Sequence, residues 1–194
     1  AGDPVDGRTL LALAAEIEGH PDNAAAALLG GLAVVGIVEG RPEALRIEPP
    51  RALRCVLFVP ELPLETKAMR AALPHQVPLR DAAFNVGRAA LTVAAFATNR
   101  SDLLRASTED RLHQPYRTAF FPELPALIAA ALEAGALGAY LSGAGSTVLA
   151  FADSAPIIDR VAAALVDVAG RDGLAGTVRI VAPRSAGAIV IDAA

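Results

Sequence analysis

The chain has 194 residues, of which 54% are hydrophobic and 20% are charged, so it can bury one large core or two smaller ones. A composition this apolar excludes disorder as a description of the whole chain. The formal net charge of −4 argues against a nucleic-acid-binding protein, because such a domain normally carries a basic face.

The sequence has the features of neither a secreted nor a membrane protein. Residues 1–4 lack the basic start and apolar run of a signal peptide. Because the sequence begins without Met, we expect it to be either trimmed or part of a longer polypeptide. The apolar stretches 24–38 and 82–97 are too short for a membrane span or are interrupted by polar residues. The one cysteine, Cys55, cannot cross-link the fold and suits a reducing compartment. We therefore expect a cytoplasmic protein that binds neither nucleic acid nor membranes.

In the first part of the chain, hydrophobic periodicity and capping residues predict two helices followed by two strands. These are a helix from a cap at Asp3 or Asp6 to about Glu18, a short helix over 24–29 that is opened by residues 20–23, a strand over 32–38 and a strand over 44–48. The sequence Glu48-Pro49-Pro50-Arg51 is the strongest boundary signal, because consecutive prolines continue neither a helix nor a central strand. We accordingly predict one domain over 1–49 and a second over 50–194.

Beyond this boundary, helices and strands alternate without a regular βαβ cadence. The predicted elements are a strand over 53–59, helices over 65–73, 79–98, 102–108 and 124–134, strands over 136–141 and 146–151, a helix over 155–168, and strands over 177–181 and 188–191. Two of these strands flank a tight glycine-rich hairpin. The pattern predicts an α+β fold, with an antiparallel sheet covered on one face by helices.

A cluster of polar and turn residues lies at the junction of the first two helices. It comprises Glu16 and the run Glu18-Gly19-His20-Pro21-Asp22-Asn23. An acid, an amide and an imidazole at a helix N-terminus can hold a polar ligand or a metal ion. Asp22 and Asn23 are equally typical helix caps, and His20 then lies on the surface, so the pattern alone leaves both interpretations open.

A glycine-rich turn, Leu141-Ser142-Gly143-Ala144-Gly145-Ser146-Thr147, separates two predicted strands. Glycines permit positive φ angles and close backbone approach, and consecutive N–H groups can form an anion-binding nest. The turn is not a Walker phosphate loop, since no Lys follows its glycines. The alternative interpretation is a plain hairpin turn.

Arginines form the third candidate cluster. Thr66 and Arg70 share one helix face, and the segment Glu109-Asp110-Arg111-Leu112-His113-Gln114-Pro115-Tyr116-Arg117 is rich in charge. Arginines are natural partners of a substrate carboxylate, because the guanidinium fork binds it bidentately. A solvated, salt-bridged surface is the alternative. Neither a zinc site nor a serine hydrolase is indicated, because the Cys and His residues are scattered and no G-x-S-x-G elbow occurs.

Taken together and in this order, the motifs resemble the homoserine kinase branch of the GHMP kinase family. The resemblance rests on 18–23 followed by Ala27-Leu28-Leu29-Gly30-Gly31, on Leu79-Arg80-Asp81-Ala82-Ala83-Phe84-Asn85-Val86-Gly87-Arg88, on 109–117 and on 141–147. It implies that 1–49 are the end of a ribosomal-S5-like N-terminal domain and that 50–194 form a ferredoxin-like domain. It also implies transfer of the γ-phosphate of ATP, with Mg²⁺, to the side-chain hydroxyl of L-homoserine in threonine biosynthesis.

The resemblance implies a catalytic and metal-binding role for the first polar cluster. Glu16 matches the acidic Mg²⁺ ligand of the family, and Glu18 is the alternative because register slips easily at a helix end. Asp22 aligns with the base of mevalonate-type relatives, and Asn23 with a group beside the reacting hydroxyl. Transfer in the homoserine branch need not use a strong base, because a loose phosphoryl-transfer transition state asks mainly for positioning.

The remaining matched positions are implied to bind substrate and nucleotide. The substrate-binding residues are His20, Asn23, Thr66, Arg70, Asn85 and Arg117, of which the two arginines clamp the carboxylate. The residues beside the nucleotide phosphates are Ser142, Gly143, Ala144 and Gly145.

The sequence also departs from the family. Ser146 stands where the family usually has proline, and the family's main phosphate loop, a Pro-x-x-x-Gly-Leu-Gly-Ser-Ser stretch, does not occur in these 194 residues. Two alternatives therefore stay open. The chain is a non-catalytic fragment or assembly module, whose unpaired strand edge at 32–38 invites homodimerisation, or it is a GHMP kinase with another small hydroxylated substrate.

Overall fold

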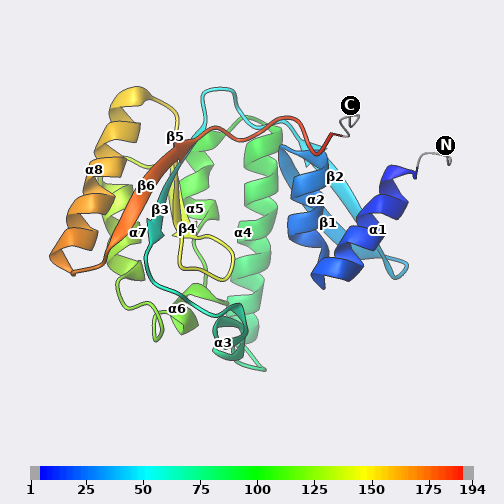
Figure 1. The fold of residues 1–194 in the computed structure, drawn as a ribbon, viewed down its shortest axis with the longest axis horizontal. Helices are drawn as coiled ribbons and strands as arrows, with labels where there is room; N and C mark the ends of the chain where they lie inside the picture. The colour runs from blue at the N-terminus through cyan, green and yellow to red at the C-terminus, as the bar shows by residue number, and fades with distance from the viewer. Residues whose placement is uncertain (1–4, 190–194) are drawn as a thin grey trace, which may run out of the picture. The chain divides into compact units, whose positions relative to one another are not determined.

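The computed structural model describes residues 5–189, with the exception of the Thr66 side chain, and divides them into two compact units (Figure 1). The first unit contains 5–50 together with 183–189, and the second contains 51–182. The chain thus passes between the units one residue after the boundary expected from the sequence, but its last described segment packs with the first unit.

The first unit consists of two helices and a hairpin. They are α1 (Gly7–Glu18), α2 (Pro21–Leu29), β1 (Leu32–Val38) and β2 (Arg41–Ile47). The β1 and β2 strands pair antiparallel, and α1 and α2 pack against them. Asp6 caps α1 by accepting the N–H groups of Arg8 and Thr9, which confirms one of the two caps predicted from the sequence.

The segment 183–189 is held to the first unit by backbone hydrogen bonds. Ala188 donates its N–H to the carbonyl of Ala27 at 2.9 Å, and Gly31 donates to Arg184 at 2.8 Å. Residues 188 and 189 are not in a strand, so the predicted strand over 188–191 is wrong at these two positions, while 190–191 lie outside the described residues. Contacts with distant parts of the chain fix this segment, and periodicity carries no information about them.

The second unit is built on a four-stranded antiparallel sheet in the order β4-β5-β3-β6 (Figure 1). The strands are β3 (Arg54–Pro60), β4 (Gly138–Leu141), β5 (Val148–Ala152) and β6 (Gly176–Val181). The helices are α3 (Thr66–Ala71), α4 (Leu79–Ala97), the 3₁₀ turn η1 (Ser101–Leu103), α5 (Leu104–Ser107), α6 (Gln114–Arg117), α7 (Leu124–Glu133) and α8 (Ala155–Arg171). This succession and strand order are the β-α-β-β-α-β arrangement of ferredoxin-like domains, so the predicted α+β class is confirmed.

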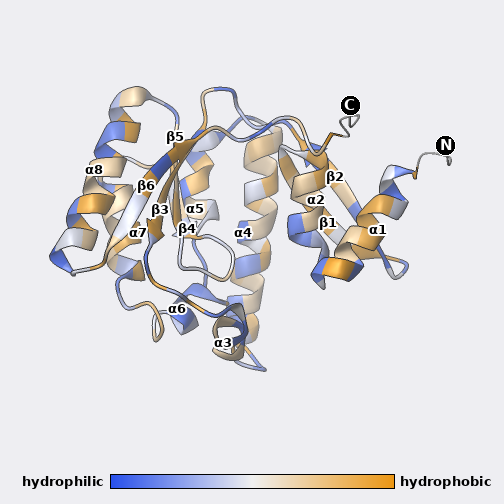
Figure 2. Ribbon diagram, viewed as in Figure 1, coloured by the Kyte–Doolittle hydropathy of each residue, from blue (hydrophilic) through white to orange (hydrophobic). Residues whose placement is uncertain are grey.

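Helices cover both faces of this sheet, whereas the sequence predicted helices on one face. On one face Val56 and Phe58 of β3 pack with α7 and α8, and the ribbon coloured by hydropathy in Figure 2 shows hydrophobic stretches along the strands and α8. On the other face Phe151 of β5 meets Phe96 near the end of α4, with ring centroids 5.9 Å apart. Successive strand residues point to opposite faces, which is why both faces can be apolar.

Two helical details differ from the predictions. The helix predicted over 102–108 is a 3₁₀ turn followed by α5, and the four-residue helix α6 was not predicted. A helix as short as α6 has no periodicity to detect and depends on its tertiary contacts. Among the described residues, the structure contains no helix long and apolar enough to cross a membrane.

Candidate functional site

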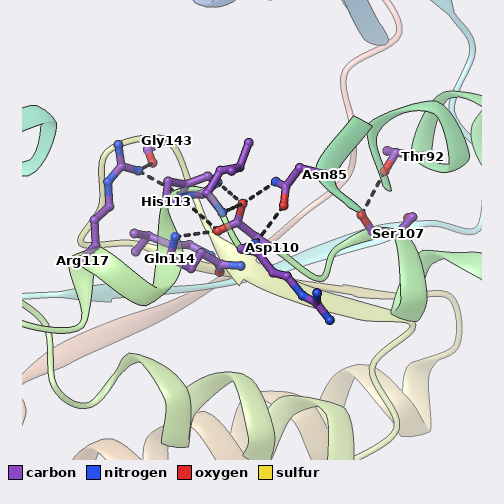
Figure 3. Close-up of polar contacts among 11 residues, drawn as sticks. Asn85, Thr92, Ser107, Asp110, His113, Gln114, Arg117 and Gly143 are labelled. Carbon is purple, nitrogen blue, oxygen red and sulfur yellow. Dashed lines mark hydrogen bonds and ion pairs between the residues drawn. The ribbon is translucent and has the colours of Figure 1, made fainter. Parts of the chain in front are cut away.

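The centre of the candidate site is the buried carboxylate of Asp110 (Figure 3). Its side chain is 6% exposed and accepts the backbone N–H groups of Leu112, His113 and Gln114 at 3.1, 2.9 and 2.6 Å. It also accepts the side-chain amide of Asn85 at 2.6 Å. Burial alone raises the pKa of Asp110, but the N–H groups of Gln114 and His113 and the Asn85 amide outweigh it and lower that pKa. The carboxylate is therefore ionised and fully engaged as an acceptor.

Helix α4 holds the first half of the 109–117 segment. The Asn85 carbonyl oxygen accepts the backbone N–H of Arg111 at 2.9 Å. The guanidinium groups of Arg88 and Arg111 lie 4.3 and 3.9 Å from the ring centroid of Phe84. Such cation–π contacts add to the hydrogen bonds in fixing the segment on the helix.

Helix α6 carries the second half of the segment to the glycine turn, residues 142–146. The Arg117 residue is 7% exposed, and its Nη1 donates to the carbonyl of Gly143 at 2.7 Å (Figure 3). The side-chain oxygen of Gln114 accepts the N–H of Leu141 at 2.8 Å. Two hydrogen bonds thus connect α6 with the turn and with the strand end that precedes it.

Arg117 is a buried cation without a paired carboxylate. Its Nε is buried and has no hydrogen-bond partner within the described part of the chain, where no carboxylate lies within ion-pair distance of its guanidinium. Burial lowers the pKa of Arg117, Asp110 raises it, and the nearby positive charge of Arg70 lowers it again. A guanidinium in this state is a natural binding group for an anion, because an uncompensated buried charge is costly.

His113 lies between the two charged groups. Its Nε2 is 3.6 Å from the Asp110 carboxylate, and its Nδ1 is 3.3 Å from Nη1 of Arg117. Burial lowers the pKa of His113, the Asp110 charge raises it, and the Arg117 charge lowers it, with a net lowering. The ring is accordingly neutral at neutral pH, so backbone N–H groups rather than a histidine charge keep Asp110 ionised.

The glycine turn leaves part of its backbone free for a ligand. Ser142 donates to the Thr147 carbonyl at 2.8 Å, and Gly145 donates to Ser142 at 3.0 Å. Gly143 has a φ of 58° and Gly145 a φ of 101°, both in the region that favours glycine. The N–H groups of Gly143 and Ala144 have no hydrogen-bond acceptor among the residues that the structure describes. Neighbouring free N–H groups of this kind can bind an anion.

The candidate residues of the first unit lie at the end of α1 and the start of α2. Glu16 is exposed, and the His20 ring contacts the Asp22 carboxylate through Nδ1. Burial raises the pKa of Asp22, but the Asn23 N–H, at 2.9 Å, and the His20 charge lower it overall. The N-cap of α2 is His20, which makes no side-chain cap, so Asp22 is not the cap of this helix, although its carboxylate accepts a free N–H of the first turn. In the described ranges, no three His, Cys, Asp or Glu side chains form a metal-binding group.

The structure thus joins several of the predicted residues and leaves others apart. Asn85, Arg117 and Gly143 belong to one hydrogen-bonded network in the second unit, and Arg70 is close enough to affect the charge of Arg117. The side chain of Thr66 lies outside what the structure describes. The central residue Asp110 was not singled out from the sequence, although an acid shortly before Gln114-Pro115 is a typical start signal for a helix.

The chain is similar to known proteins over nearly all of its length. Residues 92–169 match the family described as GHMP kinases C terminal. The chain is 41% identical over 190 residues to homoserine kinase of Moorella thermoacetica, covering 98% of this chain and 64% of that protein. It is 50% identical over 158 residues to homoserine kinase of Streptomyces avermitilis, covering 81% of this chain and 51% of that protein. The crystal structure of homoserine kinase from Cytophaga hutchinsonii matches with a TM-score of 0.88 and 26% identity, covering 96% of this chain and 61% of that one.

The second unit is therefore a GHMP kinase C-terminal domain, in agreement with its ferredoxin-like sheet and its glycine turn. Within that family, the relatives described above are homoserine kinases, which confirms the resemblance found in the sequence. The chain spans between 51% and 64% of the length of these relatives.

Proposed function

We propose that this chain carries the amino-acid site of a kinase that transfers the γ-phosphate of ATP to the side-chain hydroxyl of L-homoserine, a step of threonine biosynthesis. The proposal is supported by the relatives named homoserine kinase and by a buried arginine that lacks a carboxylate partner in the described residues. A cytoplasmic location, and the absence of nucleic-acid and membrane partners, are part of the same proposal.

The observation that carries the proposal is the state of Arg117. Its Nη1 is already used by Gly143, while its Nε is buried and available. The substrate carboxylate would neutralise this charge and accept from the open edge of the guanidinium, with Arg70 contributing a second positive charge. A sugar substrate has no carboxylate to place there, so the arginines favour homoserine over a sugar. Mevalonate does carry a carboxylate, and the relatives named homoserine kinase, rather than the arginines, favour homoserine over mevalonate.

The other residues are assigned by their matched positions. His20 and Asn23 would hold the substrate near its hydroxyl. The resemblance also assigns Asn85 and Thr66 to substrate binding, and for Thr66 this assignment stays a prediction. The free N–H groups of the turn formed by Ser142, Gly143, Ala144 and Gly145 would face the phosphates. Asp22 would act on the hydroxyl mainly through position and charge.

Mg²⁺ would be held by Glu16, or by Glu18 in the alternative register. Mg²⁺ is commonly bound by one or two carboxylates together with substrate phosphates and water, and not by a cage of protein ligands alone. A single exposed acid such as Glu16 fits this pattern. When bound, the ion would supply positive charge to the transferring phosphoryl group.

Calorimetry on the chain itself tests the substrate assignment. L-homoserine should bind, and aminopropanol, which is homoserine without its carboxylate, should bind at least about tenfold more weakly. Arg117→Ala should abolish this preference, whereas Arg171→Ala, at an exposed helix end, should leave it unchanged. Equal affinity of the wild-type chain for both compounds would contradict the assignment.

A second candidate function is that of a module that acts with another polypeptide segment. The chain spans 64% or less of the relatives described above, and β1 pairs with β2 alone in the two-stranded sheet of the described residues. Ile17, Ile37 and Leu45 are exposed apolar side chains of the same unit. Measuring ADP release from Mg-ATP with and without L-homoserine separates the two functions, because homoserine-dependent turnover by the chain alone excludes the module. Binding without turnover, with association in sedimentation, supports it.

A further inference from the structure

We infer that Asp110 and Asn85 are positioning residues that hold Arg117 in its ligand-binding orientation and tie it to the glycine turn. The inference rests on the proposed function only where homoserine affinity is used to test it. The positioning of Arg117 itself is argued from hydrogen bonds alone. Neither side chain needs to touch the substrate for this role.

The first step is the number of donors that meet at Asp110. Four N–H groups, three from the backbone and one from Asn85, point at two carboxylate oxygens on a side chain that is 6% exposed. Only an acceptor with two oxygens satisfies all of them. An amide at this position turns an NH₂ group toward donors and leaves a buried polar group unsatisfied.

The second step is the dependence of α6 on that carboxylate. The helix has four residues, Gln114–Arg117, and its N-cap residue His113 makes no side-chain cap. A single turn is not stable by itself, since helix nucleation is unfavourable. Asp110 takes over the missing cap by accepting the N–H groups of His113 and Gln114 at the helix start.

The third step leads from α6 to the ligand groups. Gln114 and Arg117 both lie on this helix, and they bond to Leu141 and Gly143 at 2.8 and 2.7 Å. A rotation of α6 would break both bonds together and would turn the guanidinium away from its present orientation. The position of Arg117 therefore follows the state of Asp110, although the two side chains are seven residues apart in the sequence.

The fourth step is the direction of the Asn85 bonds. Its amide nitrogen donates to Asp110 and its oxygen accepts from the Arg111 N–H, so the side chain joins α4 to two residues of the 109–117 segment. Both functional ends are engaged inside the protein. These contacts favour a positioning role for Asn85 over the direct substrate contact assigned to it from the resemblance.

The direction of the hydrogen bond between Asn85 and Asp110 suggests an experiment in which the two side chains are swapped. Asp110→Asn leaves one oxygen for two sets of donors, so it can accept either from Asn85 or from His113 and Gln114, but not from both. Asn85→Asp places two carboxylates opposite each other, so each single variant loses part of the network. The double variant reverses the bond, with residue 110 donating and residue 85 accepting. The reversed pair still offers oxygens to the N–H groups of Arg111, His113 and Gln114, and it loses chiefly the bond from Leu112.

Two readouts are required, calorimetric affinity for L-homoserine and site-resolved amide hydrogen exchange. Each single variant should weaken homoserine binding by about tenfold or more, and the double variant should regain most of the loss. Exchange should accelerate at His113 and Gln114 in the single variants and slow again in the double variant. Asp102→Asn, at an exposed acid paired with Arg100, is the control and should change neither readout.

The outcomes separate this inference from the proposed function. If the wild-type chain binds no homoserine, the proposed function fails and the exchange pattern alone decides the inference. Unchanged hydrogen exchange at His113 and Gln114 in Asp110→Asn would overturn the inference. Wild-type homoserine affinity of the single variants would also overturn it. So would a double variant that binds homoserine no more tightly than the weaker single variant. Should Asp110→Asn fail to fold, Asn85→Ala removes one of the four donors and provides the same test with a smaller expected loss.

Discussion

The guanidinium of Arg117 donates to the main-chain carbonyl of Gly143 over 2.7 Å, which joins two residues 26 positions apart in the sequence. One residue belongs to the charged 109–117 segment and the other to the glycine turn. The bond means that the group assigned to the substrate carboxylate also holds the loop assigned to the nucleotide phosphates. The two halves of the proposed site are therefore mechanically connected.

Replacing this arginine by lysine should separate the two tasks. Arg117→Lys keeps a positive charge, but an ammonium cannot both hold the Gly143 carbonyl and grip a carboxylate bidentately. We expect homoserine affinity to fall by about tenfold to a hundredfold, as measured by calorimetry. The matched control is Arg171→Lys, which should have wild-type affinity; equal affinities of the two variants would argue against a bidentate grip.

The glycines of the turn should differ in their tolerance of alanine. Gly143→Ala should cost about 1 kcal/mol, because its φ of 58° is left-handed but the space around it is open. Gly145→Ala should cost more, about 2 kcal/mol, because its φ of 101° is less accessible and a Cβ would lie 3.2 Å from the Leu141 side chain. Urea denaturation gives both values. Gly170→Ala, in the last part of α8 with nothing close by, is the control and should be neutral or slightly stabilising.

Adjacent residues of α8 allow a paired test of the core. Leu165 is fully buried between the helix and the sheet, whereas Val166 beside it is 52% exposed. Leu165→Ala should lower the free energy of unfolding by about 2–5 kcal/mol, since it leaves a cavity. Val166→Ala should change it by less than about 0.5 kcal/mol. Similar losses at the two positions would mean that α8 does not pack on the sheet through this face.

The burial of His113 should make stability depend on pH in a defined window. Its folded pKa is lowered, chiefly by burial and in part by Arg117, so the unfolded chain binds the proton more readily. The stability linked to this residue is then complete above the unfolded pKa of about 6.5 and is lost as the pH falls below it toward the folded pKa. His113→Gln should remove this part of the pH dependence in urea titrations between about pH 5 and 8. A variant that retains the wild-type slope would contradict the shift.

Cys55 should be unreactive in the folded protein. Burial raises the pKa of its thiol to about 11, so little thiolate is present at pH 8. Iodoacetamide should modify the native chain much more slowly than the chain in urea, with mass spectrometry as the readout. Fast native labelling would show that the strand carrying Cys55 opens readily.

The local sequence was sufficient to predict most of the elements. Capping by Asp6 and the apolar run along β3 are contained in a few neighbouring residues, so local rules are sufficient to predict them. The charged segment and the glycine turn were also recognisable, because their residue types are unusual for a core. The role of Asp110 was not, since an acid before a short helix has the same local appearance whether it is solvated or buried.

What the sequence by itself determined was the class of fold, the order of most elements and the family. What only the tertiary structure decided was which distant residues meet. Asn85 with Asp110, Arg117 with Gly143, and the return of Ala188 to Ala27 all join positions at least 25 residues apart. Such contacts depend on the path of the chain between them and on which polar groups are removed from water together. Hydrophobic periodicity indicates which side of a helix or strand is buried, but it does not indicate which other element that side packs against.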